Sequence, residues 1–221
     1  STGGVDLNLG DDDSKYVKLS SPETVSIYGQ SFKGIYVGSN GYITFTEGDE
    51  EYSESLENHF ALLRISGLFR DLNPTAGGSV SWNYTADGIA ATWSKVPEYG
   101  TNNSNTFQIE LFFDGRIRLS WLEVGAEGGI VGLSEGEGIP PDFVETDLSE
   151  LPPIQPPPPP VEDDLTEEFL SPKDVFDLEY ASVTFTPTSG GTSYIGSLED
   201  ITQLPTSTIG ATNLKLSDDL P

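Results

Sequence analysis

A tight turn between two runs of β-forming residues constrains the fold of this chain more than any other feature. Residues Ile35 to Val37 and Tyr42 to Phe45 are β-branched or aromatic, and Ser39-Asn40-Gly41 lies between them. Asparagine and glycine tolerate the positive φ angles that hairpin turns require. The stretch therefore predicts a β-hairpin over residues 35–45.

Similar signals recur along the first two thirds of the chain. Asp87-Gly88 and Asp114-Gly115 each lie between apolar runs, and Gly129 to Leu133 has the composition of a further strand. His59 to Phe69 is largely apolar and fits either a buried strand or a short helix. Short runs without a long helical pattern are typical of a sandwich or barrel. We predict an all-β fold, a β-sandwich of antiparallel strands.

The composition changes after residue 133. Residues 134–150 are rich in glycine, proline and acidic side chains, and residues 151–160 read LPPIQPPPPP, which favours a polyproline II spacer. Beyond it, Ser182 to Thr186 and Tyr194-Ile195 are short strand-like runs in an acidic segment. We expect a sandwich domain over 1–150, a polyproline linker over 151–160 and a small β-rich unit over 161–221. With so little core of its own, that unit is expected to dock on a neighbouring copy.

Charge and composition narrow the functional classes. The 221 residues include 36 acidic and 10 basic ones, and the net charge of −26 argues against nucleic-acid partners and favours cation binding. The absence of cysteine excludes disulfides and thiolate sites, and the absence of methionine indicates a piece processed or excised from a longer chain. No apolar run approaches ~18 residues, so we expect no membrane insertion. The expected location is extracellular or at the cell surface.

Calcium is the cofactor that the acidic residues favour most. Calcium binds six to eight oxygen ligands, often from carboxylates and carbonyls in loops. Two groups of candidate ligands and one acidic loop stand out, none with the spacing of an EF-hand: Asp11, Asp12 and Asp13; Asp71 and Asn73; and the loop from Asp49 to Glu57. The alternative is that these side chains form an ordinary solvated acidic surface.

The chain offers little evidence of catalysis. Gly132-Leu133-Ser134-Glu135-Gly136 matches the G-x-S-x-G motif of serine hydrolases, but that motif needs a following helix, and Pro140-Pro141 disfavours one here. The single histidine, His59, would have to act as the base. Trp82, Trp93 and Trp121 fit either a sugar-stacking platform or, as we favour, the core. We predict that the protein is not an enzyme.

The two ends of the chain share a short pattern. At an offset of 207 residues, Leu214 and Leu216 match Leu7 and Leu9, and Asp218-Asp219 matches Asp11-Asp12. This pattern indicates either one period of a tandem array or ends that engage equivalent sites in successive subunits. A strand supplied by one copy to the sheet of the next would join copies in this way. We take these four leucines as candidate assembly residues.

Four ordered segments resemble the NIDO-type extracellular domain. They are YVGSNGYITF, FRDLNPTAGGSVSW, NTFQIELFFDGRIRLSW and GGIVGLSEGEG, within residues 25–138. That family is found in nidogen, α-tectorin and a membrane mucin, and a related form occurs in large secreted bacterial multidomain proteins. The resemblance implies an extracellular β-rich module of adhesive or matrix proteins, with no catalytic residue to transfer.

Together these features predict an extracellular structural module of a repetitive surface fibre, sheath or adhesin stalk. Its partners would be other copies of itself, joined head to tail or as tandem repeats. The alternative is a ligand- or glycan-binding adhesin module, calcium-dependent or not, whose partners would be glycans or matrix proteins. Exposed aromatic residues beside a cleft would favour this alternative, and buried tryptophans would favour assembly.

Overall fold

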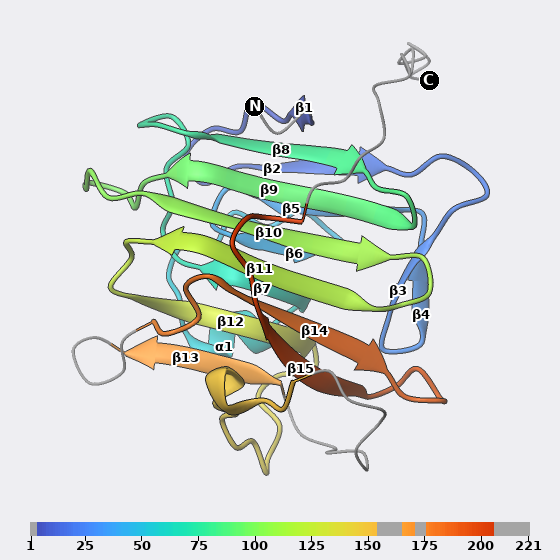
Figure 1. Ribbon diagram of the computed structural model, residues 1–221. Coiled ribbons are helices and arrows are strands. Elements are labelled where there is room, and N and C mark those ends of the chain that lie inside the picture. The colour runs from blue at the N-terminus through green and yellow to red at the C-terminus, as the bar shows by residue number, and fades with distance from the viewer. Residues whose placement is uncertain (1–3, 154–164, 171–175, 206–221) are drawn as a thin grey trace.

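Two antiparallel sheets face each other in this protein (Figure 1). The structure is a computed structural model and describes residues 4–153, 165–170 and 176–205. The predicted all-β sandwich is confirmed. Within the described residues, no helix is long and apolar enough to cross a membrane.

The larger sheet has seven strands, in the order β1-β8-β9-β10-β11-β14-β15. They are β1 (Val5–Asp6), β8 (Ser79–Tyr84), β9 (Gly88–Val96), β10 (Asn105–Phe112), β11 (Ile117–Val124), β14 (Ala181–Pro187) and β15 (Tyr194–Asp200). The smaller sheet has six strands, in the order β13-β12-β7-β6-β5-β2. They are β13 (Thr166–Leu170), β12 (Gly128–Glu135), β7 (Leu63–Phe69), β6 (Tyr42–Thr44), β5 (Gly34–Gly38) and β2 (Ser14–Lys18). A two-stranded ribbon of β3 (Val25–Ile27) and β4 (Gln30–Phe32), helix α1 (Leu56–Phe60) and the 3₁₀ turn η1 (Leu148–Glu150) complete the described elements.

The three hairpins predicted from turn residues are confirmed. β5 pairs with β6, β8 with β9 and β10 with β11, all antiparallel. Gly41 and Gly115 have the positive φ that their turns require, 84° and 90°. The ambiguous segment from His59 to Phe69 contains both predicted alternatives, because it begins at the end of α1 and continues as β7.

The division into two units is corrected by the strand pairing. β13 pairs with β12 of the smaller sheet, and β14 pairs with β11 of the larger one. Residues 166–200 therefore add strands to both sheets of the same sandwich, instead of forming a separate unit that docks on a neighbour. Phe169 and Phe185, from β13 and β14, are 1% and 0% exposed, so these strands complete a core that residues 1–150 leave open. Most of the predicted polyproline linker, residues 154–160, lies outside the described residues.

Two tryptophans of the larger sheet tie the two layers together. The Trp93 indole Nε1 donates a hydrogen bond to the Ser39 carbonyl at 3.1 Å, and the Trp121 Nε1 donates to the Gly67 carbonyl at 2.7 Å. Both side chains are fully buried, and the Trp93 ring stacks on Phe107 with centroids 4.9 Å apart. A buried indole needs a partner for its N–H group, so these bonds fix how the sheets face each other.

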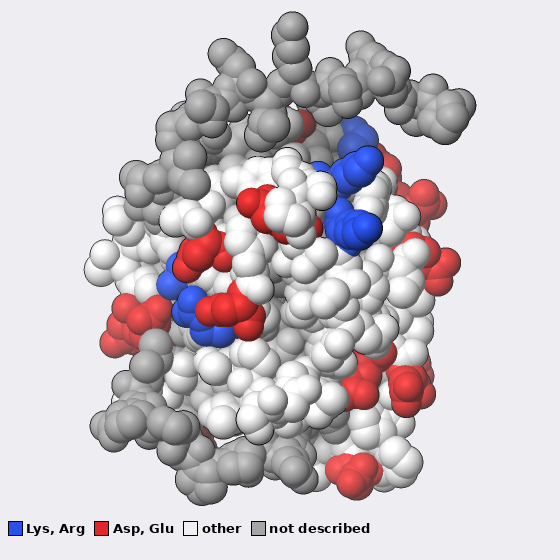
Figure 2. Space-filling model, turned by 90° about the vertical axis from the view of Figure 1, so that its right-hand side faces the viewer, with Lys and Arg blue, Asp and Glu red and all other residues white. Residues whose placement is uncertain are grey.

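The ends of the sandwich differ in what their loops carry. Figure 2 shows the right-hand end of Figure 1, where acidic side chains are spread over the face and basic ones gather in two groups. The opposite end is formed by the loops before β2, between β5 and β6, between β7 and β8, between β9 and β10, and between β11 and β12. We call it the loop end, and it holds the candidate metal ligands.

Candidate functional site

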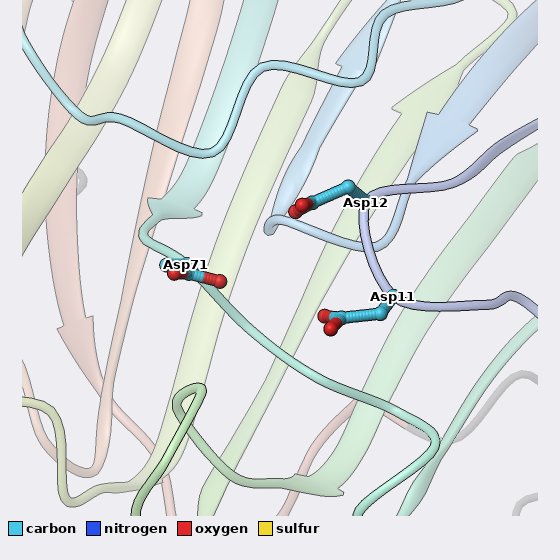
Figure 3. Close-up of side chains that lie close together, drawn as sticks. All are labelled: Asp11, Asp12 and Asp71. Carbon is cyan, nitrogen blue, oxygen red and sulfur yellow. The ribbon is translucent and has the colours of Figure 1, made fainter.

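Three of the five predicted metal ligands lie together at the loop end (Figure 3). Asp11 and Asp12 come from the loop that precedes β2, and Asp71 follows β7. The carboxylates of these residues turn toward one another, and one oxygen from each lies within 4.8 Å of the others. We call these three side chains the aspartate cluster.

The electrostatics of the aspartate cluster are unfavourable without a cation. Burial, and then the nearby charges of Asp12, Asp11 and Glu54, together raise the pKa of Asp71 to about 6 against the opposing effect of Arg70. Burial and then Asp12 also raise the pKa of Asp11. The Oδ1 atom of Asp71 is shielded from solvent and has no hydrogen-bond partner among the described residues. A divalent cation would relieve both the repulsion and this missing bond.

Asn40, which the sequence indicated only as a turn residue, holds the aspartate cluster in place. Its side chain is fully buried, its Oδ1 accepts from the Leu72 backbone N–H at 2.9 Å, and its Nδ2 donates to Asp12 Oδ1 at 2.9 Å and to the Glu51 carbonyl. One amide therefore fixes Asp12 beside the backbone that follows Asp71. Nothing in the sequence distinguishes this asparagine from any other hairpin asparagine.

The other two predicted ligands have different roles. Asp13 Oδ2 accepts a hydrogen bond from the Gly10 backbone N–H at 2.9 Å. Asn73 Oδ1 accepts from the Thr75 backbone N–H at 2.9 Å and so closes a local turn. The structure therefore brings Asp11, Asp12 and Asp71 together, whereas Asp13 is not part of this group and Asn73 Oδ1 is engaged in a local turn.

The predicted acidic loop is attached to the sandwich by arginines. Arg64, 1% exposed, donates from Nη2 to Asp49 Oδ2 at 2.6 Å, and its guanidinium lies 4.1 Å from the centre of the Tyr42 ring. Arg70 forms ion pairs with Glu54 of the loop and with Glu98. These acidic side chains are thus anchored to the fold and are not simply a solvated surface.

Beside the aspartate cluster lies an acidic hollow of about 300 Å³. It is lined by Glu54, Arg70, Glu127, Gly128, Gly129, Glu168 and Phe169. Burial raises the pKa of Glu168, and Glu145, Glu57 and Glu54 raise it further. The hollow therefore extends the negative field of the loop end.

The residues of the hydrolase-like motif have separate partners. Ser134 donates its hydroxyl proton to the Leu62 carbonyl at 2.9 Å. His59 lies fully buried, with Nδ1 3.0 Å from Ser66 Oγ and Nε2 3.4 Å from Thr166 Oγ1. Burial and then Arg64 lower the pKa of His59 to about 3, so its imidazole is neutral at pH 7.

The tryptophans do not form a common exposed surface. Trp93 and Trp121 are 0% exposed and belong to the core. Trp82 is partly buried and packs against the same core and against Tyr84, with ring centroids 5.5 Å apart. Tyr99, whose side chain is 61% exposed, donates its backbone N–H to the Asp71 carbonyl at 2.9 Å.

The N-terminal copy of the shared pattern is built into the sandwich. Leu7 and Leu9 are 8% and 6% exposed and belong to the main core, and residues 5–6 pair with β8 as an edge strand. The predicted partners Leu214 and Leu216 lie outside the described residues. The motif thus joins an edge strand, two core leucines and two members of the aspartate cluster.

Comparison with known protein families assigns most of the chain to one family. A model of the family described as NIDO related matches residues 1–146. The chain belongs to the NIDO-related family. The match confirms the resemblance drawn from the four sequence segments, and NIDO-related domains are typically extracellular modules. No curated protein and no solved structure matches this NIDO-related chain.

The family match ends before the last three strands of the sandwich. β13, β14 and β15 lie C-terminal to residue 146 in the sequence, yet they pair with β12 and β11 inside the matched region. In this NIDO-related chain, the segment that carries the family signal is therefore not the complete folding unit.

Proposed function

We propose that this chain is an extracellular structural module whose copies join head to tail in a repetitive surface fibre, sheath or adhesin stalk. The observation that carries the proposal is that one sequence pattern occurs near both ends of the chain. Its first copy, around Leu7 and Leu9, is an integral strand and core element, and its second copy, around Leu214 and Leu216, repeats the same spacing at the other end of the chain. Contacts of this kind between unlike ends generate filaments when they do not close into a ring.

The burial of the tryptophan side chains favours an assembly function over the binding of sugars to an aromatic surface. Trp93 and Trp121 are core residues, so they offer no aromatic surface to a glycan. The net charge of −26 also requires specific contacts for assembly, because like-charged surfaces repel one another. Leucines that bury as Leu7 and Leu9 do would provide such contacts at a defined position.

Replacing Leu214 and Leu216 by aspartate is expected to abolish assembly. Each leucine buried at an interface contributes about 2 kcal/mol, so losing both and adding two charges lowers the association constant by at least about 1,000-fold. Light scattering after size-exclusion chromatography and negative-stain imaging would show multimers or filaments for the unchanged chain and monomers for the variant.

Leu220→Asp is the matched control, because Leu220 lies in the same segment but aligns with Asp13, outside the shared pattern. This variant should assemble almost as well as the unchanged chain. Monodisperse monomers of the unchanged chain at concentrations near 1 mM would overturn the proposal, since at that concentration even a weak specific contact is populated.

A second candidate function is calcium-dependent ligand binding by the loop end, and we propose the aspartate cluster as its calcium site. Three features support it: the three converging carboxylates, the unpartnered Oδ1 of Asp71, and the exposed Tyr99 ring on an adjoining segment. Sugar hydroxyl oxygens can serve as calcium ligands, and the apolar face of a sugar ring can pack on an aromatic side chain. Glycans or matrix proteins would be the partners.

Asp71→Asn is expected to stabilise the calcium-free protein above pH 6 and to remove its response to calcium. Because the folded-state pKa of Asp71, about 6, lies above its ordinary value of 3.8, its stabilising contribution is complete below pH 3.8 and is lost as the pH rises through 6. Calcium at 100 times its Kd would add about 2.7 kcal/mol to the unchanged protein. Thermal melts from pH 4 to pH 8, with calcium or with a chelator, measure both effects.

Glu50→Gln serves as the control, because it removes one charge from an exposed position outside the aspartate cluster. It should keep the full calcium response. An equal thermal midpoint with calcium and with chelator for the unchanged protein would exclude the calcium site and leave the assembly proposal untouched.

A further inference from the structure

We infer that the C-terminal segment, residues 213–219, binds to a second copy of this chain at the position that residues 6–12 occupy here. We call this position the edge site. The inference rests on the proposed head-to-tail assembly and adds its mechanism: copies are joined by a strand that one supplies to the larger sheet of the next.

The edge site first requires an extended backbone. β1 pairs antiparallel with β8, with Val5 opposite Trp82 and Asp6 opposite Ser81, and the Leu7 N–H donates to the Val80 carbonyl at 2.9 Å. β1 is the outermost strand of the seven-stranded sheet. Any segment that is extended at the positions of Asp6 and Leu7 can make the last of these backbone bonds, as in other cases of strand addition.

The edge site next requires two apolar side chains with one residue between them. Leu7 and Leu9 are 8% and 6% exposed and belong to the main core cluster. Filling both positions with leucine is worth about 2 kcal/mol each. Leu214 and Leu216 have the same spacing, and Asn213 precedes them as Asp6 precedes Leu7.

The edge site also accommodates two acidic residues two positions after the second leucine. Asp12 Oδ1 accepts a hydrogen bond from Asn40 Nδ2, and both Asp11 and Asp12 face Asp71. Asp218 and Asp219 stand at the matching positions. Lys15 Nζ donates to the backbone carbonyls of Leu7 and Asn8, contacts that are independent of the side chains and so remain open to another segment.

One difference between the segments makes the C-terminal one the weaker binder. Asn8 has a φ of 46°, in the left-handed region that asparagine tolerates better than most residues, and the matching residue is Lys215. A lysine there costs about 1 kcal/mol more. The N-terminal segment therefore holds its own edge site in an isolated copy, and the C-terminal segment binds best to a copy whose edge site is free.

Disulfide trapping between two variants tests the inference, because the natural chain has no cysteine. The acceptor lacks residues 1–12 and carries Ser81→Cys, and the donor is the full chain with Asn213→Cys. Asp6 and Ser81 face each other next to the hydrogen-bonded pair of Leu7 and Val80, so Asn213→Cys in this register would lie within disulfide distance of Ser81→Cys. Mild oxidation is expected to yield a disulfide-linked donor–acceptor pair, seen on a non-reducing gel.

A donor with Ser217→Cys is the matched control, because residue 217 aligns with Gly10, away from the pairing with Ser81, and it should give at least about tenfold less product. If the shortened acceptor fails to fold, the full chain with Ser81→Cys replaces it, and the same product is expected more slowly because the N-terminal strand must first leave. Equal trapping by both donors, or a disulfide only within one chain, would overturn the inference.

The outcomes separate this inference from the function on which it rests. Multimers of the natural chain without trapping at Ser81→Cys would mean that copies join through another surface, and the edge-site inference would fall alone. Monomers without trapping would remove both proposals.

Discussion

A fragment of residues 1–150 is expected not to fold, although it contains the whole segment that matches the NIDO-related family. Without β13 the smaller sheet loses the strand that pairs with β12, and without β14 and β15 the larger sheet loses two strands beside β11. The buried side chains of Phe169, Val183 and Phe185 leave the core with them. Removing one buried phenylalanine costs about 3–5 kcal/mol, and whole domains are stable by only about 5–15 kcal/mol, so the loss exceeds the total.

Circular dichroism and urea unfolding measure this effect. A chain that ends at residue 205 keeps every described strand and serves as the control; it should unfold in one cooperative transition. The 1–150 fragment should show no such transition and should expose apolar surface to a hydrophobic dye. Cooperative unfolding of the fragment would contradict a structure in which all the strands belong to one sandwich. In that case the free energy of unfolding would fall with urea at a slope in proportion to the size of the fragment.

Gly41→Ala is expected to destabilise the protein by more than about 3 kcal/mol. Gly41 has a φ of 84°, and a Cβ atom added there would lie 1.9 Å from the Leu68 carbonyl oxygen. The Gly41 carbonyl also accepts backbone hydrogen bonds from Gly67 and Leu68 at 2.9 and 3.1 Å, so the turn cannot move away without breaking them. Backbone strain and steric overlap therefore act together at this position.

Gly100→Ala separates the two causes. Gly100 has a similar φ of 71°, but nothing lies within 4 Å of an added Cβ. Its substitution should cost only about 1 kcal/mol, the conformational part of the penalty. Urea unfolding of both variants gives the comparison, and similar losses for the two would show that the close approach to Leu68 is unimportant.

Gly41→Ala should also weaken the candidate calcium site. The same turn carries Asn40, whose amide binds Asp12 and the Leu72 backbone. A displaced turn would release Asp12 from the aspartate cluster. The calcium-induced rise in thermal midpoint should then shrink in Gly41→Ala and persist in Gly100→Ala.

The hairpins show what local sequence information decides. Gly41 and Gly115 shape their turns through φ angles of 84° and 90°, Asp87-Gly88 marks the third turn without a positive φ, and each signal acts on residues within a few positions of itself. The all-β class follows from those turns and from the short apolar runs between them. Residue type alone predicts calcium ligands, so the sequence does not separate Asp13 and Asn73 from Asp11, Asp12 and Asp71.

Only the tertiary structure decided which distant segments meet. β14 pairs with β11 across more than sixty positions, and Asp71 meets Asp11 and Asp12 across a similar distance, as no local pattern specifies. The proline-rich stretch predicts a domain boundary, because its composition is typical of a stiff spacer. Composition does not indicate which sheet the strands after the spacer join. The sequence by itself determined the turns, the strand class, the acidic charge and the shared pattern at the two ends. Burial of Phe169, Phe185, Leu7 and Leu9 in one core decided the rest, because the free energy of burial depends on which apolar surfaces meet and not on their separation along the chain.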